Sequence, residues 1–144
     1  MTALREYTST EALGDPYACR ICKTRTRASR TVRFDTAPTV LLIALKLYSF
    51  NPATGVRAKP KQKIHYTFRE DFGKYLWAQS PIQYDLCGVT FHAGTIDQGH
   101  HFAFCKEGGE WWKCDDAKIT RVAAIEAGEA SPQILRYRKL TTDG

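Results

Sequence analysis

The chain has 144 residues, of which 43% are hydrophobic, 12% aromatic and 25% charged. These proportions exclude a disordered or low-complexity chain and predict one globular domain, or a large part of one. Lysine and arginine exceed the acidic residues by 21 to 15, a formal charge of +6. The longest apolar run, residues 40–45, is too short to span a bilayer, and no apolar segment follows Arg5 and Glu6 as in a secretory signal. We therefore expect an intracellular protein that does not bind membranes.

The first half of the chain predicts short elements separated by turns. Residues 11–13 favour a helical turn, and residues 27–35 favour a strand because they carry β-branched and aromatic side chains. The apolar run at 39–45 is typical of a central strand buried on both faces. Residues 51–63 predict an exposed hairpin connection, and the alternation at 63–68 predicts a half-buried strand.

The second half of the chain predicts more strands, punctuated by glycines. Residues 71–78 suit a helical turn or ordered loop, and 122–128 are weakly helical. Strands are expected at 84–91, 99–105, 110–114 and 133–140. Because strands dominate without a regular alternation of helix and strand, we predict an α+β fold built on a mostly antiparallel sheet.

One histidine and one aspartate stand out within these strands. His100 follows Gly99, and Asp115 lies on the next predicted strand, 15 residues later. Side chains of neighbouring strands lie within hydrogen-bonding reach, and a base histidine needs a carboxylate to fix its tautomer and stabilise the imidazolium. The glycine allows a close approach of backbone or substrate. The same pattern also suits a structural pair without catalytic function.

The motif around these residues resembles the histidine box of the ubiquitin-specific proteases, papain-like cysteine deubiquitinases. The box reads approximately Tyr-x-Leu-x-x-Val-x-x-His-x-Gly, then Gly-His-Tyr-x-Ala, then Trp-x-x-x-Asp-Asp. The positions that match are Tyr84, Leu86, Val89, His92 and Gly94, then Gly99, His100 and Ala103, then Trp111, Asp115 and Asp116. His101 stands where the family has Tyr.

Three further segments resemble the family in the same order. Tyr17, Cys19 and Cys22 resemble its second zinc pair, residues 38–46 its strand ending in Leu-Lys-Arg-Phe, and residues 133–137 its final strand. The resemblance implies a partial domain: the fingers and palm of a papain-like protease. By this resemblance, residues 1–144 form the C-terminal half of the catalytic domain, without the half that bears the nucleophile.

The resemblance also implies the roles of the site residues. His100 would be the general base, Asp115 would orient it, and Asp116 and Gly99 would support them. The reaction would be thiol-dependent hydrolysis of the bond after the C-terminal glycine of ubiquitin, so the expected partner is ubiquitin or a ubiquitinated protein. For His92 we favour a packed or loop-fixing role, and for Tyr84 and Trp111 a place in the core.

The five cysteines do not include the nucleophile box Gly-Asn-Thr-Cys-Tyr of the family. Cys87, Cys105 and Cys114 fall inside strands and are expected to be small buried hydrophobic residues. We therefore expect no nucleophile in this chain, no activity of the chain alone, and a partner segment that supplies the cysteine. No cofactor is required. Zinc at Cys19 and Cys22 is conceivable, but two ligands make only half of a structural site.

Two alternatives remain open. The chain could be a catalytically inactive ubiquitin-binding or regulatory module, since it carries a base without a nucleophile. The basic groups at residues 20–33 and 57–63 could instead bind nucleic acid. We do not favour the second, because charge runs are usually solvated surfaces and no base-reading motif accompanies these.

Overall fold

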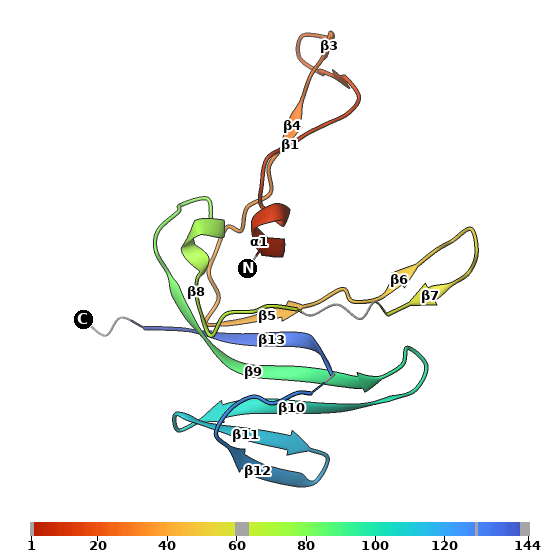
Figure 1. Cartoon of the computed structure of the whole chain (residues 1–144). Coiled ribbons are helices and arrows are strands. Elements are labelled where there is room, and N and C mark those ends of the chain that lie inside the picture. The colour runs from red at the N-terminus through yellow and green to blue at the C-terminus, as the bar shows by residue number, and fades with distance from the viewer. Residues whose placement is uncertain (1, 60–63, 129, 142–144) are drawn as a thin grey trace.

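The centre of the molecule is a seven-stranded antiparallel sheet, which we call the palm sheet. The computed structural model describes residues 2–59, 64–128 and 130–141. The strands follow the order β12-β11-β10-β9-β13-β5, and β8 also pairs with β9 (Figure 1). Their bounds are β5 Val40–Ala44, β8 Arg69–Asp71, β9 Gln83–Gly94, β10 Gly99–Glu107, β11 Glu110–Asp115, β12 Lys118–Val122 and β13 Ser131–Lys139. The predicted fold class, a mostly antiparallel sheet with little helix, is confirmed.

The hydrophobic core covers one face of this sheet. Tyr84, Leu86, Val89 and Phe91 of β9 are at most 2% exposed, and Phe104 of β10 packs edge-on against Phe91. Burial of such a side chain contributes about 1.5–3 kcal/mol. Further buried members of the core are Phe72, Tyr75, Leu76, Leu135 and Tyr137. The core therefore anchors β9, β10 and β13, and β10 carries the predicted base, His100.

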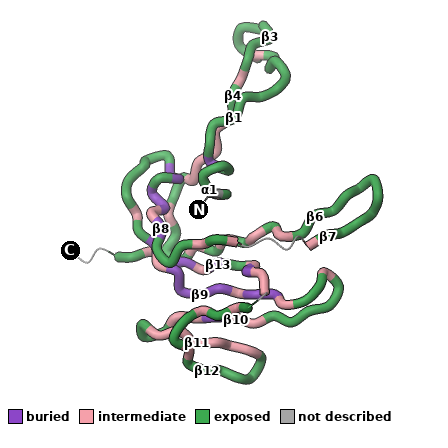
Figure 2. Tube along the Cα trace, in the orientation of Figure 1, coloured by how far each residue is buried: buried purple, intermediate pink, exposed green. Residues whose placement is uncertain are grey.

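Three two-stranded ribbons extend from the palm sheet, and their strand residues are exposed (Figure 2). The bounds are β1 Glu11–Ala12 with β4 Ser29–Arg30, β2 Tyr17–Ala18 with β3 Arg25–Thr26, and β6 Ser49–Phe50 with β7 Arg57–Ala58. The first two ribbons continue one another and form a finger that points away from the sheet (Figure 1). The ribbon of β6 and β7 confirms the hairpin connection predicted at residues 51–63 as far as residue 59, and residues 60–63 lie outside the described part.

Strand β5 corrects one prediction. It is not a central strand buried on both faces, because it pairs only with β13 and ends the order of the sheet. Exposed and half-buried residues alternate along it, and Leu42 is 63% exposed. A continuous apolar run indicates a strand but does not say what covers each face. Here Leu41 and Ile43 pack on the core, and the described residues leave the other face open.

Other expectations fail where propensity is weak. Residues 11–13 begin a ribbon instead of a helical turn, and the helix α1, Thr2–Tyr7, precedes them. Only Ser29–Arg30 of the predicted strand at 27–35 is a strand, and residues 122–128 contain no helix. Residues 64–68 alternate in burial without pairing as a strand, and residue 63 lies outside the described part. In short segments, tertiary contacts override local preference.

The 3-10 turn η1, at Phe72–Tyr75, confirms the helical turn expected within residues 71–78. The Asp71 carboxylate caps it by accepting from the Gly73 amide at 3.0 Å. Among the described residues, no helix has the length and apolar character needed to cross a bilayer.

Candidate active site

The site lies on the face of the palm sheet where β10 and β11 run side by side. Ala103 pairs with Cys114 in the register, so the neighbouring pair, Phe102 and Asp115, shares the opposite face of the sheet. His100 lies two residues before Phe102 and therefore points to that same face. His100 Nε2 lies 2.5 Å from Asp115 Oδ1. The predicted contact between these two side chains on neighbouring strands is confirmed.

Lys113 completes the surroundings of the carboxylate. Its Nζ lies 2.8 Å from Asp115 Oδ2 and 4.7 Å from the centre of the Phe102 ring. Hydrogen bonds from Lys113 and then His100 hold the pKa of Asp115 below its usual value. The hydrogen bond to Asp115 raises the pKa of His100 above its usual 6.5. The carboxylate therefore stays ionised and stabilises an imidazolium beside it.

Asp116 and Gly99 flank this pair. Asp116 occupies the turn after β11 with a φ of 51°, and its negative charge also raises the pKa of His100. One polar atom from each of His100, Asp115 and Asp116 lies within 4.8 Å of the others. This is the one group of three possible metal ligands in the described ranges. The Lys113 ammonium already neutralises part of its charge, so the group does not fit a cation site well.

The second ring nitrogen of His100, Nδ1, faces no hydrogen-bond partner among the residues that the structure describes. The side chain is 48% exposed. With Nε2 committed to Asp115, Nδ1 is the atom left to exchange a proton with another group. The arrangement can therefore serve as an oriented base.

The three cysteines of the palm sheet do not lie beside His100. Cys105 and Cys114 project from the opposite face of the sheet, as the pairing of Cys105 with Trp112 shows. Burial, followed by the neighbouring Cys114, raises the pKa of Cys105. Cys87 is 6% exposed, and its Sγ donates to the carbonyl of Arg136 at 3.4 Å. The predicted burial is confirmed for Cys87, whereas Cys105 and Cys114 are half-buried.

Cys19 and Cys22 lie in the turn between β2 and β3, at the tip of the finger. The Cys19 amide donates to the Thr24 carbonyl at 2.9 Å, which closes the turn. Cys22 Sγ lies 2.9 Å from the Thr24 hydroxyl. Hydrogen bonds from Thr24, followed by one from Cys19, lower the pKa of Cys22 to about 7. Two thiols supply half of a structural zinc site, and the described residues do not complete it.

A third set of polar residues lies behind the hairpin of β9 and β10. His92, for which we favoured a packed or loop-fixing role, is 5% exposed and contacts Tyr48 and Lys59. Sequence reasoning missed these two partners, which precede His92 by 44 and 33 residues. No local pattern marks such a contact.

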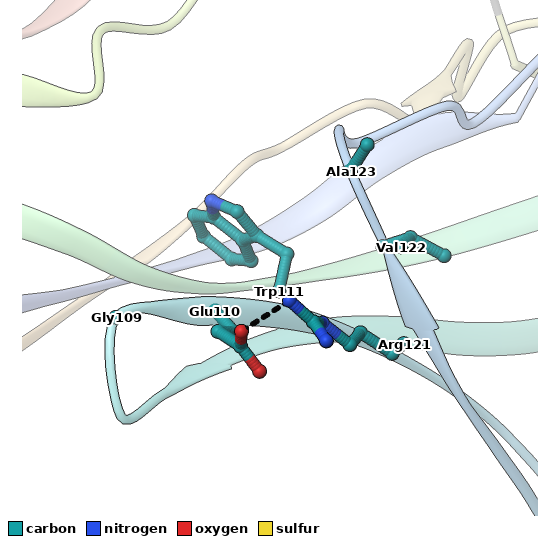
Figure 3. A pocket seen from close by; sticks show the side chains of 6 residues that line it. All are labelled: Gly109, Glu110, Trp111, Arg121, Val122 and Ala123. Carbon is teal, nitrogen blue, oxygen red and sulfur yellow. Dashed lines mark ion pairs between the residues drawn. The ribbon is translucent and has the colours of Figure 1, made fainter.

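The pocket of about 500 Å³ in Figure 3 lies away from this site. Trp111, Val122 and the ion pair of Glu110 with Arg121 line it. Glu110 begins β11 and Asp115 ends it, so the pocket and the His100 pair occupy opposite ends of one strand. It takes no part in the arrangement described above.

Comparison with known proteins identifies the family. A family profile for ubiquitin carboxyl-terminal hydrolases matches residues 11–137. The chain is 32% identical to ubiquitin carboxyl-terminal hydrolase 26 of Oryza sativa subsp. japonica, over 88% of this chain and 12% of that protein. It is 36% identical to ubiquitin carboxyl-terminal hydrolase 17-like protein E of Mus musculus, over 92% and 25%.

The fold is also that of a solved enzyme module. A SAGA DUB (deubiquitinase) module bound to ubiquitin aldehyde superposes with a TM-score of 0.84 at 25% identity, over 97% of this chain and 33% of that one. The chain thus spans about a third or less of the length of these relatives. With the profile matched over nearly its whole length, the chain belongs to the ubiquitin carboxyl-terminal hydrolase family.

Proposed function

We propose that this chain supplies the base and its orienting carboxylate to a thiol-dependent deubiquitinase. The observation that carries the proposal is the 2.5 Å contact between His100 Nε2 and Asp115 Oδ1. In this role His100 is the general base and Asp115 holds its tautomer, with Asp116 and Gly99 as supporting residues. The relatives are named ubiquitin carboxyl-terminal hydrolases, and one solved neighbour holds ubiquitin aldehyde. These names support ubiquitin, or a protein that carries it, as the partner.

The reaction would proceed through a covalent intermediate. His100 Nδ1 takes the proton of a cysteine thiol, and the thiolate attacks the carbonyl carbon of the C-terminal glycine of ubiquitin. The C–N bond breaks, and the His100 imidazolium gives its proton to the leaving amine. A water molecule, deprotonated by His100, then hydrolyses the thioester and releases the ubiquitin carboxylate. Asp115 stabilises the imidazolium throughout. No cofactor takes part.

We place the nucleophile outside residues 1–144. Cys105 and Cys114 point away from His100, and Cys87 is buried with its Sγ bonded to a backbone carbonyl. The His100 side chain, which is 48% exposed, instead leaves Nδ1 available to a thiol from another segment. In this proposal the chain corresponds to the C-terminal half of the catalytic domain, and the other half brings the cysteine.

The test uses an electrophile built on the C-terminal tail of ubiquitin. The chain alone is expected to remain unlabelled, and labelling is expected once the nucleophile-bearing half of a related family member is added. His100→Ala should abolish this labelling, and His65→Ala, an exposed histidine outside the site, should leave it unchanged. Labelling of the isolated chain at Cys87, Cys105 or Cys114 would overturn the proposal.

A second candidate is an inactive ubiquitin-binding module, favoured by the absence of a thiol beside His100 among the described residues. It predicts that the chain binds ubiquitin, while no complementing half restores labelling. The same experiment therefore separates the two candidates.

A further inference from the structure

Two further histidines, His101 of β10 and His92 of β9, lie on the face of the sheet opposite His100. His100 and His101 are consecutive in β10, so their side chains leave opposite faces of the sheet. His101 pairs with His92 of β9, and the two rings lie 4.6 Å apart. His92 is 5% exposed, whereas the side chain of His100 is 48% exposed. The site therefore has a solvent-facing front, and the opposite, rear face of the sheet carries buried His92 beside exposed His101.

Lys59 forms hydrogen bonds with His92 and Gly94 on this rear face. Its Nζ donates to His92 Nδ1 at 3.0 Å, to the His92 carbonyl at 3.1 Å and to the Gly94 carbonyl at 3.1 Å. The three protons of the ammonium are thus matched by three acceptors on the end of β9. Gly94 pairs with Gly99, the residue before His100. Lys59 therefore holds the end of β9 that faces the start of β10.

A second chain of hydrogen bonds joins His92 to strand β13 and to the segment between β5 and β6. Gln133 Nε2 of β13 donates to the Tyr48 hydroxyl at 2.6 Å, and that hydroxyl lies 3.3 Å from His92 Nδ1. His101 Nε2 lies 3.0 Å from Gln133 Oε1. Tyr48 belongs to the segment between β5 and β6. Residues outside the hairpin, Tyr48 and Gln133, thus contact the two histidines on its rear face.

Gly99 transmits the position of His92 to the site. A Cβ on Gly99 would lie 2.0 Å from His92 Nε2 and 2.5 Å from the Ala93 carbonyl oxygen. Only a residue without a side chain can therefore sit against the His92 ring here. A movement of this ring toward Gly99 would push the Gly99 backbone, which is bonded directly to His100.

We propose that Lys59 is a positioning residue for His100. It holds the His92 ring, which the Tyr48 hydroxyl also contacts, and this ring fixes the backbone of Gly99. The position of Gly99 in turn keeps His100 Nε2 in contact with Asp115. The proposal deepens the proposed function, because it concerns the residue assigned there as the base. Neither Lys59 nor Tyr48 touches the reacting atoms in this arrangement. They act on the geometry of His100 alone.

The charges around His92 agree with this arrangement. Burial, followed by the charges of Lys59 and His101, lowers the pKa of His92 below its usual 6.5. A neutral His92 can accept from Lys59 at Nδ1 while its proton resides on Nε2. On the front face, Asp115 and Asp116 raise the pKa of His100, and Lys113 opposes them. His92 is therefore expected to titrate at a lower pH than His100.

The test reads His100 directly, by NMR titration of the histidine rings in this chain. Lys59→Met removes the ammonium and keeps most of the aliphatic stem. Lys139→Met is the matched control, because Lys139 is also half-buried but pairs with Tyr84 at the other end of β9. Asp115→Asn defines the full loss of the contact. Thermal unfolding of each variant shows whether the fold is retained.

We expect Lys59→Met to lower the pKa of His100 toward the value in Asp115→Asn, and to broaden its ring signals. Lys139→Met should leave the wild-type value, and Lys59→Arg should restore part of it, because a guanidinium can reach the same acceptors. If Lys59→Met does not fold, Tyr48→Phe, which removes one hydroxyl, should give a smaller shift in the same direction. A wild-type pKa of His100 in a folded Lys59→Met or Tyr48→Phe chain would overturn the proposal.

A second readout uses the chain complemented with a nucleophile-bearing half. Lys59→Met should lower kcat by about tenfold to hundredfold with KM nearly unchanged, as for a small misplacement of a catalytic group. If the wild-type pair is inactive, the proposed function fails, but the titration still decides the role of Lys59. A rise in KM with an unchanged kcat would contradict a positioning role.

Discussion

The palm sheet and the ribbons of this chain are stabilised in different ways. The palm sheet buries aromatic side chains such as Tyr84 and Phe104, which are 0% and 1% exposed. The strands of the ribbons are two residues long and exposed throughout, and Ile21 at the tip of the finger is 93% exposed. Non-local burial holds the first region, whereas a few local hydrogen bonds hold the second.

This difference separates the two kinds of chemistry in the molecule. His100 and Asp115 come from neighbouring strands, so their contact depends on the packing of the whole sheet. Cys22 and Thr24 lie two residues apart in one turn, so their contact depends only on that turn. Changes in the core should therefore disturb the first contact and spare the second.

The largest effect is expected from Phe104→Ala in the palm sheet. The variant removes a fully buried ring that packs against Phe91, at a cost of about 3–5 kcal/mol in the free energy of unfolding. Phe50→Ala in the ribbon of β6 and β7 removes a ring that is 62% exposed and should cost no more than about 0.5 kcal/mol. Urea unfolding of both variants makes the comparison, and equal losses would contradict it.

A smaller effect is expected from Glu70→Gln. Glu70 is 5% exposed and accepts from Thr67 and Tyr75 at 2.9 and 3.0 Å, with Lys74 beside it. Loss of the charge should cost about 1–3 kcal/mol. On the finger, Glu11→Gln breaks an exposed ion pair with Arg30 and should cost less than about 1 kcal/mol. Urea unfolding at neutral pH measures both.

The same carboxylate gives a pH dependence. Burial alone would raise the pKa of Glu70, but hydrogen bonds from Lys74, Thr67 and Tyr75 outweigh it and keep the pKa below its usual 4.5. Its stabilising contribution is therefore constant above about pH 4.5 and is lost as the pH falls through the lowered value. The Glu70→Gln chain should lose less stability than wild type over this acidic range.

A still smaller effect on stability is expected from Asp115→Asn, since both partners of the His100 contact are partly exposed. Because the pKa of His100 is raised in the folded chain, the contact stabilises the fold fully below pH 6.5 and loses its effect as the pH rises through the raised value. Unfolding at two pH values, one on each side, measures this. A stability difference that grows with pH would contradict the assigned contact.

No effect on stability, but a change in reactivity, is expected from Thr24→Val. Alkylation of Cys22 should follow a pKa of about 7 in wild type and shift toward the ordinary thiol value near 8.5 in the variant. At pH 7 the reaction should slow by roughly tenfold. Mass spectrometry of the labelled peptides gives the rates, and buried Cys87 provides the unreactive reference. An unchanged rate would show that Thr24 does not set the reactivity of Cys22.

The sequence predicted those parts of the fold in which neighbouring residues decide the structure. The apolar and aromatic runs that form β9, β10 and β11 are separated by Gly94 and by Gly108 and Gly109, so their positions and the contact of His100 with Asp115 were predictable. Strand β5 was wrongly placed at the centre of the sheet. Its composition does not reveal that the face bearing Leu42 lacks a cover among the described residues.

The contacts behind the hairpin were not predictable for a different reason. Lys59 looks like one of several exposed basic residues of a polar turn, and only the fold brings its Nζ to His92. Such contacts depend on loop closure over tens of residues, which no local pattern encodes. Whether Cys19 and Cys22 bind zinc stays a prediction, because the pair alone does not determine it.

Strand β9 contains both well-buried residues and an exposed end. Its 12 residues run from Gln83 to Gly94; Tyr84, next to the first, is fully buried, and Gly94 is exposed. Local opening should therefore become easier along the strand, and backbone amides should exchange with solvent faster toward Gly94 than near Val89. His100 pairs with Ala93, close to this end of β9. The hydrogen bonds of Lys59 to His92 and Gly94 should therefore determine the fraction of molecules in which His100 is held against Asp115.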